Sequence, residues 1–229
     1  AIEFSHQSVI AEHRWLQRKL RLTADDRQLA RSALSDMNIL RELIWPVIAG
    51  CGCCLLTPGK RNHVAAHLDV MARHHVTVIG AVPIMIEALL SQARGGGALA
   101  TLRRVICTTD LFLGEQYNRF CALLPDAKFY NIYGLSEALY VSSYDNAAGS
   151  DGDPSIARAK QTRPMILTDA FDEVGVEQVG RLFVSGLDGA MQQRHASNPG
   201  AMHFAARAGA ALFDTGRLAY KSIDGAIHL

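Results

Sequence analysis

The sequence predicts an α/β fold, in which a layered and mostly parallel sheet with helices on its faces is followed by a small β-barrel-like subdomain. Over the first 145 residues, amphipathic helical segments alternate with short apolar runs, as expected for a parallel sheet connected by helical crossovers. After a polar stretch rich in Gly, Asp and Pro, the helical periodicity stops and short strands follow. We therefore expect an α/β layered subdomain over residues 1–145 and a β-rich, distorted-barrel subdomain over residues 146–229.

Four segments of the first half carry helical signals. Apolar side chains recur on one helical face in residues 8–22 and again in residues 61–75. Residues 83–93 and 114–124 supply two further helices, and Pro83 marks the start of the first of these. All four helices are expected to pack against a sheet.

Four apolar runs lie between and after these helices. Each is too short for a globular helix and rich in β-branched, aromatic or other apolar residues, which predicts buried parallel strands over 51–56, 76–82, 103–108 and 128–133. In the second half, Gly and Asp turns separate further predicted strands within 163–171, 180–186, 211–220 and 224–229. The segment 188–209 has weak periodicity and is not placed.

Charge and cysteine usage exclude several classes of function. Lys plus Arg (23) nearly balance Asp plus Glu (22), so no net field favours binding to nucleic acid or to an anionic membrane. The chain has five cysteines without paired spacing, and its first stretch has no basic or apolar leader pattern. Both observations favour a reduced, cytoplasmic protein. No apolar run is long enough to cross a bilayer.

A hydroxyl and a carboxylate stand side by side in the stretch NIYGLSEA, directly after the strand predicted over 128–133. Ligands of open parallel sheets bind beyond the carboxyl ends of the strands. Ser136 could therefore hydrogen-bond a nucleotide phosphate while Glu137 holds the accompanying Mg²⁺. Equally open is the alternative that Ser136 caps a following helix with Glu137 in its first turn.

Three other patterns favour structural interpretations. His63 and His67 have the spacing of a two-histidine metal site, but the pattern lacks a third ligand, so surface histidines are favoured. The CGCC stretch has no second Cys/His pair, which favours buried small side chains in a strand and unreactive thiols. The RGGG stretch lacks the Lys-Ser/Thr of a phosphate loop and indicates a surface turn.

Read in order, several stretches resemble successive motifs of the adenylation domains of nonribosomal peptide synthetases, members of the acyl-adenylate-forming superfamily. They are SDMNILRELIWPVIAGCGCCLL, HHVTVIGAVPIMIEALL, LRRVICTTDLFLGEQ, NIYGLSEA, GRLFVSG and FDTGRLAYKSIDGAIHL, and together they cover nearly the whole chain. The resemblance implies a core of layered α/β subdomains and a distorted β-barrel. It also implies ATP- and Mg²⁺-dependent activation of an amino acid and its transfer to the phosphopantetheine thiol of a partner carrier protein.

The resemblance assigns roles to individual residues. Asn131 and Tyr133 would contact adenine, Ser136 the α-phosphate and Glu137 the Mg²⁺ ion. Asp36 would pair with the α-ammonium group of the amino acid, a charge-assisted contact that favours the amino-acid-activating branch. The remaining residues implied for the acyl pocket form a mostly apolar set suited to an apolar or aromatic side chain: Met37, Leu40, Gly80, Ile106, Thr108, Ile132 and Tyr140.

Several residues depart from the family pattern. The family has an aspartate that accepts hydrogen bonds from both ribose hydroxyls where this chain has Arg217, and an arginine has donors only. Arg181 replaces a usual glutamate, residues 108–110 replace a Gly-Gly-Glu type and residues 155–159 a Gly-Arg-Pro type. The phosphate loop and the lysine-bearing small domain of the family would lie outside the 229 residues, so we expect a core truncated at both ends.

Two functions are open at this point. The first is an inactive or weakly active adenylation domain that serves as a scaffold beside carrier-protein and other synthetase domains. The second is the core of an active amino-acid-activating domain. We expect the chain alone to show weak ATP binding and little ATP–pyrophosphate exchange, and we expect Arg217→Asp alone not to restore exchange.

Overall fold

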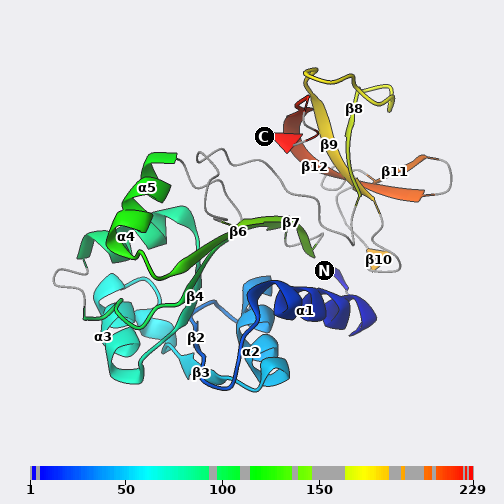
Figure 1. Cartoon of the computed structure of the whole chain (residues 1–229). Coiled ribbons are helices and arrows are strands. Elements are labelled where there is room, and N and C mark those ends of the chain that lie inside the picture. The colour runs from blue at the N-terminus through cyan, green and yellow to red at the C-terminus, as the bar shows by residue number, and fades with distance from the viewer. Residues whose placement is uncertain are drawn as a thin grey trace. The chain divides into compact units, whose positions relative to one another are not determined.

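A computed structural model describes residues 2–3, 6–92, 97–108, 114–135, 139–145, 163–185, 192–193, 204–207, 210–223, 225 and 227–228. The chain divides into two compact units (Figure 1). One comprises residues 13–131 and 145–153, and the other comprises residues 1–12, 132–144 and 154–229. The predicted division at residue 145 stays a prediction.

The first unit is built on a sheet of strand order β3-β2-β4-β5-β6-β7. The strands of this sheet are β2 (Arg27–Ala30), β3 (Gly52–Leu55), β4 (Val78–Ala81), β5 (Arg104–Thr108), β6 (Lys128–Leu135) and β7 (Leu139–Asp145). The end of β6 from Ile132 onward and all of β7 except Asp145 are assigned to the other unit. The pairs β2–β3, β2–β4 and β4–β5 are all parallel. The predicted α/β fold with a mostly parallel sheet is confirmed.

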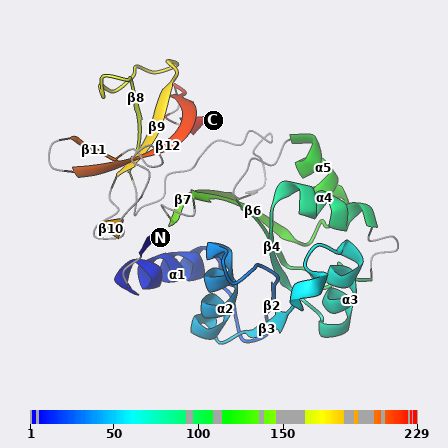
Figure 2. The same cartoon turned by 180° about the vertical axis from the view of Figure 1, so that it is seen from behind.

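Helices lie on both faces of this sheet. They are α1 (His6–Leu20), α2 (Met37–Ala49), α3 (Val64–His74), α4 (Pro83–Gln92) and α5 (Gly114–Leu123), and a 3₁₀ turn covers Pro58–Lys60. Figure 2 shows α3, α4 and α5 together on one face and α2 on the other. The C-terminal half of α1 packs with α2, where Trp45 Nε1 donates to Gln17 Oε1 at 3.2 Å. Buried Leu29, Ile79, Phe120 and Phe129 belong to one core between the sheet and the α3–α5 layer.

The order of the strands creates a topological switch point between β2 and β4. The connection that leaves β2 runs through α2 to β3 at one edge of the sheet, whereas the connection that leaves β4 runs through α4 to β5 in the opposite direction. Where two adjacent parallel strands diverge in this way, a crevice opens beyond their carboxyl ends, and ligands of doubly wound sheets bind there. The carboxyl ends of β2 and β4 are therefore the expected position of a ligand site.

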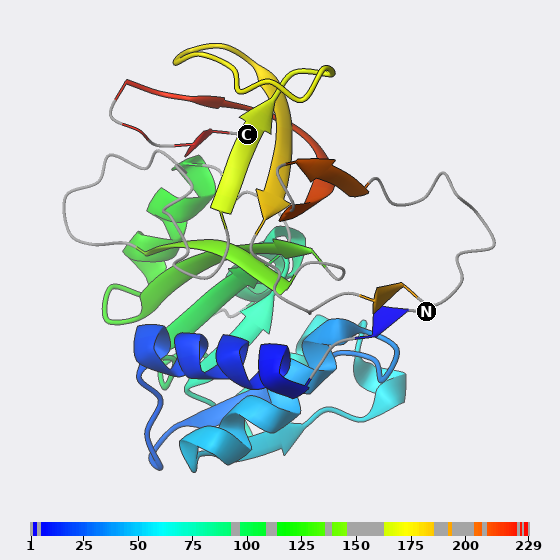
Figure 3. The same ribbon diagram turned by 90° about the vertical axis from the view of Figure 1, so that its right-hand side faces the viewer.

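The second unit contains a curled antiparallel sheet of order β11-β12-β9-β8, with β13 paired to β12 (Figure 3). Its strands are β8 (Arg163–Leu167), β9 (Gly180–Ser185), β11 (Phe204–Arg207), β12 (Ala210–Lys221) and β13 (Ile227–His228). A separate two-residue pair joins β1 (Ile2–Glu3) to β10 (Gln192–Gln193). The predicted β-rich, barrel-like second part is confirmed.

Three expectations from the sequence are wrong. The stretch after Ala138 is the strand β7, so the alternative in which Ser136 caps a following helix is excluded. The CGCC stretch does form β3, but β3 is an edge strand, and Cys53 and Leu55 are exposed rather than buried. His67 is not a surface residue, because it is fully buried on α3.

None of the helices in the described ranges is both long enough and apolar enough to span a membrane.

Candidate functional site

The loop between β2 and α2, residues 31–36, lies at the carboxyl end of β2 and is anchored by a carboxylate from α2. Glu42 Oε2 accepts hydrogen bonds from the backbone N–H groups of Arg31 (2.7 Å) and Ser32 (2.8 Å). Glu42 Oε1 accepts a third from the Ser32 hydroxyl at 2.8 Å. Glu42 is only 4% exposed. Burial raises the pKa of Glu42, and the hydrogen bonds from Ser32 and Arg31 offset that effect only in part.

Asp36 ends this loop as the N-cap of α2. Its backbone is extended, and its Oδ1 accepts a hydrogen bond from the Asn38 N–H at 2.8 Å, which satisfies one of the orphan donors of the helix. The side chain is exposed, and among the described residues no donor reaches its Oδ2. One carboxylate oxygen is thus fixed by the helix while the other remains able to accept from a ligand.

The neighbouring strands contribute an open position and a buried wall. Gly80 of β4 and Ile106 of β5 are register partners, so these two predicted pocket residues lie side by side. A Cβ built at Gly80 would meet nothing within 4 Å, which leaves open space above the backbone. Ile106 (3% exposed), Thr108 (6%) and Asn131 (7%) are buried along β5 and β6.

The other predicted site residues are placed less completely. Met37 begins α2, and Leu40 lies one turn further on and is 38% exposed. Ile132, Tyr133 and Tyr140 belong to the second unit, where Ile132 is fully buried. Ser136 and Glu137 lie outside the described residues. The assignment of an acyl pocket and a nucleotide site to these residues therefore stays a prediction.

Sequence reasoning missed the polar pair of Arg31 and His67. Arg31 Nε donates to His67 Nε2 at 3.3 Å, and the His67 Nδ1 lies 2.9 Å from the carbonyl oxygen of His63, to which it donates in the matching tautomer. Burial lowers the pKa of His67, and the nearby Arg31 charge lowers it further. Both ring nitrogens of His67 are thus engaged in hydrogen bonds within the protein, which favours a structural role for this side chain. The described residues contain no group of three His, Cys, Asp or Glu side chains that could hold a metal ion.

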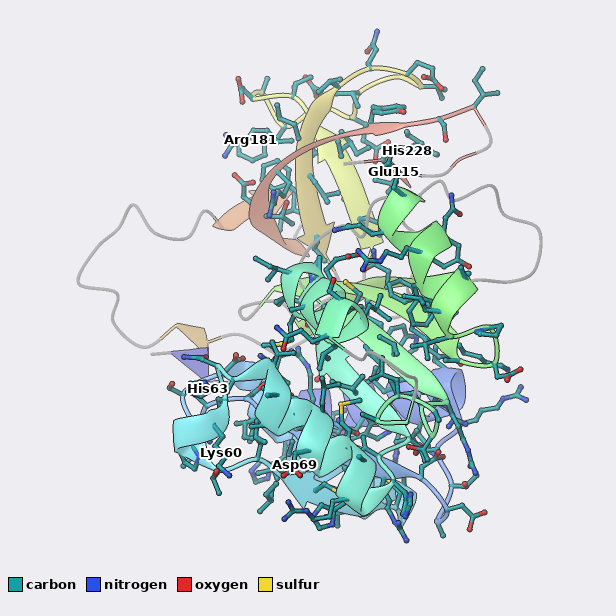
Figure 4. The ribbon with its side chains drawn as sticks, turned by 90° about the vertical axis from the view of Figure 1, so that its left-hand side faces the viewer. Lys60, His63, Asp69, Glu115, Arg181 and His228 are labelled. Atoms are coloured by element: carbon teal, nitrogen blue, oxygen red, sulfur yellow. The ribbon has the colours of Figure 1, made fainter. Side chains whose placement is uncertain are left out.

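The loop that follows β3 is exposed. Lys60 and His63 are solvent-accessible there, and Asp69 on α3 pairs with Arg73 at 2.8 Å on the surface (Figure 4). Partial desolvation raises the pKa of the exposed Cys53 to about 11, which favours the thiol over the thiolate; that the thiols of this stretch are unreactive stays a prediction. Neither the loop after β3 nor the cysteines of β3 offer an arrangement of polar groups comparable to that of the β2–α2 loop.

In the second unit, Arg217 lies in an irregularity of the β9–β12 ladder between Asp214 and Leu218. Gly216 adopts φ +69°, and its N–H donates to Asp214 Oδ1 at 2.9 Å. The backbone N–H of Arg217 donates to Thr215 Oγ1 at 3.2 Å, and its side chain is exposed. This bulge therefore presents the guanidinium of Arg217 to solvent.

The other arginine that departs from the family pattern has a partner. Arg181 of β9 forms an ion pair with Asp214, whose side chain is 2% exposed, and also lies 3.6 Å from Asp169 (Figure 4). Its guanidinium carbon lies 5.8 Å from the centre of the Phe183 ring. Arg181 is thus an integrated part of this sheet rather than an unsupported substitution.

Comparison with known proteins agrees with the motif order. The chain is 24% identical over 196 residues to zwittermicin A synthase ZmaJ of Bacillus cereus, which covers 81% of this chain and 37% of that protein. It is 25% identical over 241 residues to indigoidine synthase of Dickeya dadantii (strain 3937), which covers 99% of this chain and 16% of the synthase. The chain thus spans well under half the length of these relatives.

Solved structures agree on the fold. The nonribosomal peptide synthetase FmoA3 in its AMPPNP-bound form superimposes with a TM-score of 0.86 at 20% identity, covering 98% of this chain and 25% of that one. CmiS6 superimposes with a TM-score of 0.83 at 20% identity, covering 98% and 56%. The family model described as AMP-binding enzyme matches residues 1–192. By motif order, family model and fold, this chain belongs to the AMP-binding enzyme family and carries the core of an adenylation domain.

Proposed function

We propose that the chain belongs to a nonribosomal peptide synthetase, recognises an amino acid at the β2–α2 loop, and binds ATP too weakly for efficient adenylation. It would then serve the assembly line chiefly as a scaffold for neighbouring domains. Support for the class of protein comes from the matching relatives, which are named as synthases. The single observation that carries the weak-binding proposal is Arg217.

Arg217 occupies the position where the family resemblance expects an acceptor for two ribose hydroxyls. A guanidinium has five N–H donors and no acceptor, so both hydroxyls would lose their partner. The exposed bulge already presents this side chain to solvent. Loss of a charged acceptor commonly weakens binding by about 1.5–3 kcal/mol, or roughly one to two orders of magnitude. The ribose of ATP is therefore a poor fit to this position.

Amino-acid recognition is supported by Asp36. Its Oδ2 has no partner among the described residues, and its loop lies at the switch point of the sheet. A carboxylate that accepts from an ammonium group makes a charge-assisted hydrogen bond, which an uncharged fatty chain cannot offer. The open space above Gly80 beside Ile106 would suit an apolar substrate side chain.

The same family role implies partners and cofactors. ATP would arrive with Mg²⁺, for which Glu137 is the proposed ligand, and Ser136 would contact the α-phosphate. A carrier protein bearing phosphopantetheine would be the acyl acceptor of an active domain. As a scaffold, this chain would contact the carrier protein and other synthetase domains without passing an acyl group to them.

A second candidate function is an active amino-acid-activating domain. The ion pair of Arg181 with buried Asp214 favours it, because one departure from the family pattern is met by a fitting partner rather than left as damage. If Arg217 were accommodated in the same way once nucleotide is bound, adenylation would proceed.

Amino-acid-dependent ATP–pyrophosphate exchange separates the two functions. The assay is run on this chain and on the synthetase that contains it, with a panel of apolar and aromatic amino acids. We expect exchange close to the no-enzyme background in both. Robust exchange by a synthetase carrying Arg217 would refute the scaffold function and establish the active one. Equilibrium dialysis with labelled ATP then measures whether binding or chemistry is lost.

A further inference from the structure

We infer that Glu42 is a positioning residue, which holds the β2–α2 loop in the one geometry that leaves a carboxylate oxygen of Asp36 directed to a ligand's ammonium group. The inference rests on the proposed amino-acid recognition by Asp36. It concerns a residue that never touches the substrate itself.

The loop is closed by hydrogen bonds at both ends. At its start, Glu42 accepts from Arg31 N, Ser32 N and the Ser32 hydroxyl, all at 2.7–2.8 Å. At its end, the Asp36 N–H donates to the Ala33 carbonyl at 2.9 Å, and Asp36 Oδ1 accepts from Asn38. Residues 31–36 therefore have little freedom while Glu42 is in place.

Glu42 and Asn38 lie four residues apart on α2, so the same helix supplies both anchors of the loop. The three hydrogen bonds that Glu42 accepts from Arg31 and Ser32, called the clamp below, fix the strand end of the loop relative to the helix. The hydrogen bond from Asn38 N–H to Asp36 fixes the helix end. If the clamp is released, Asp36 can still cap α2, but the loop before it is no longer held against the helix. The direction of the unpartnered Oδ2 would then vary, and with it the contact to an ammonium group.

Because these hydrogen bonds are buried, their loss is strongly destabilising. Glu42 is 4% exposed and Ser32 is 7% exposed, so truncation of Glu42 leaves two backbone N–H groups and a hydroxyl without partners in a largely dry environment. Glutamine is the matched conservative replacement. Its amide oxygen can accept from both N–H groups at the Oε2 position, and its amide N–H can donate to the Ser32 hydroxyl, which rotates to accept.

The first test needs no ligand. Hydrogen exchange of the amides of Arg31 and Ser32 is measured in the wild-type chain, in Glu42→Gln and in Glu42→Ala. We expect at least about tenfold faster exchange at these amides in Glu42→Ala, since each loses a buried hydrogen bond, and a change of less than about threefold in Glu42→Gln. Phe120→Leu, a core change on α5, serves as the control for general destabilisation. Equal acceleration in Glu42→Ala and Phe120→Leu would refute the clamp.

The second test measures discrimination for the ammonium group. Binding of L-leucine and L-phenylalanine is compared with binding of 4-methylpentanoate and 3-phenylpropanoate, which lack only the amino group. We expect the wild type to prefer the amino acids by about ten- to a hundredfold. Glu42→Ala should reduce that preference at least about fivefold with little change for the des-amino acids, and Glu42→Gln should restore it.

The outcomes separate this inference from the proposed function. Equal weakening of amino acid and des-amino acid by Glu42→Ala would show a purely structural role and overturn the inference while leaving amino-acid recognition intact. A wild type that binds neither kind of ligand, or binds both equally, would overturn amino-acid recognition and the positioning role with it. In that case, faster hydrogen exchange of the Arg31 and Ser32 amides in Glu42→Ala would show that Glu42 holds the loop in place without any effect on ligand binding.

Discussion

Arg104 Nη1 donates a 2.9 Å hydrogen bond to Oδ1 of the fully buried Asp26, 78 residues earlier in the chain. Asp26 also accepts from the backbone N–H of Thr23 at 2.9 Å and from the Thr77 hydroxyl at 2.9 Å. The residues around it precede or begin β2, β4 and β5, so one carboxylate joins the amino ends of three parallel strands. The β2–α2 loop, the candidate site, lies at the opposite, carboxyl end of β2.

We expect Asp26→Ala to lower the free energy of unfolding by about 3–5 kcal/mol, because it leaves Arg104 Nη1 and the Thr77 hydroxyl without the carboxylate that accepts from them. Urea denaturation monitored by circular dichroism measures the change. Asp69→Ala is the matched control, since it removes an exposed ion pair with Arg73 and should cost less than about 1 kcal/mol. A loss for Asp26→Ala no larger than for Asp69→Ala would contradict the role of Asp26.

The neutral state of His67 predicts a pH dependence of stability. Because burial lowers its pKa below the ordinary value of 6.5, the folded state binds fewer protons than the unfolded state. The stabilisation is fully present above that ordinary value and is lost as pH falls towards the depressed pKa. We therefore expect the wild type to lose more unfolding free energy than His67→Gln between about pH 7.5 and pH 5.5.

The comparison with His67→Gln isolates this effect, because other titrating groups, Glu42 among them, are common to both proteins. Glutamine offers both an acceptor for Arg31 and a donor for the His63 carbonyl. Parallel profiles for the wild type and His67→Gln would mean that His67 does not contribute.

Gly180 tests the close packing of the second unit. A Cβ at this position would lie 2.7 Å from Val174 Cγ1 and 2.8 Å from the Leu167 carbonyl oxygen. The backbone cannot yield easily, so we expect Gly180→Ala to destabilise the protein by about 1–3 kcal/mol. Gly80→Ala, which meets nothing within 4 Å, should change stability by less than about 1 kcal/mol. Thermal unfolding of both variants gives the comparison, and similar losses would contradict it.

Much of the fold follows from local patterns. The strand Val78–Ala81 is a continuous apolar run, Arg104–Thr108 has an apolar centre, and helices such as Val64–His74 have a clear apolar face. The strand Arg27–Ala30 was missed, because it is four residues long and begins with two polar side chains. Helix α2 was not identified as a helix, since Pro46 stands inside it.

The candidate site was only partly accessible to sequence reasoning. Asp36 was identified through the family motif, and the structure adds that one of its oxygens caps a helix. The role of Glu42 and the pairing of His67 with Arg31 were missed, because the contacting residues are 10 to 36 positions apart in the sequence and no local pattern joins them. Edge exposure of Cys53 likewise depends on strand order, which no local pattern reveals.

The last prediction concerns Arg217 and ATP. Arg217→Ala removes an exposed cation without supplying an acceptor, whereas Arg217→Asp supplies a carboxylate that can accept from two ribose hydroxyls. The bulge should tolerate both changes, because the backbone N–H of residue 217 and the Gly216 turn keep their partners Thr215 and Asp214. We expect Arg217→Asp to tighten ATP binding by about tenfold or more, and Arg217→Ala to change it by less than about threefold.

Equilibrium dialysis with ATP and with 2′,3′-dideoxy-ATP makes this test specific to the ribose. The gain in Arg217→Asp should vanish with the dideoxy nucleotide, because the new carboxylate then has no hydroxyl donors to bind. A gain that persists with dideoxy-ATP would come from a contact other than the ribose hydroxyls, and it would contradict the ribose-acceptor explanation. If ATP already binds the wild-type chain tightly and Arg217→Asp brings no improvement, Arg217 does not limit nucleotide binding, and the case for a weakened adenylation domain loses the observation on which it depends.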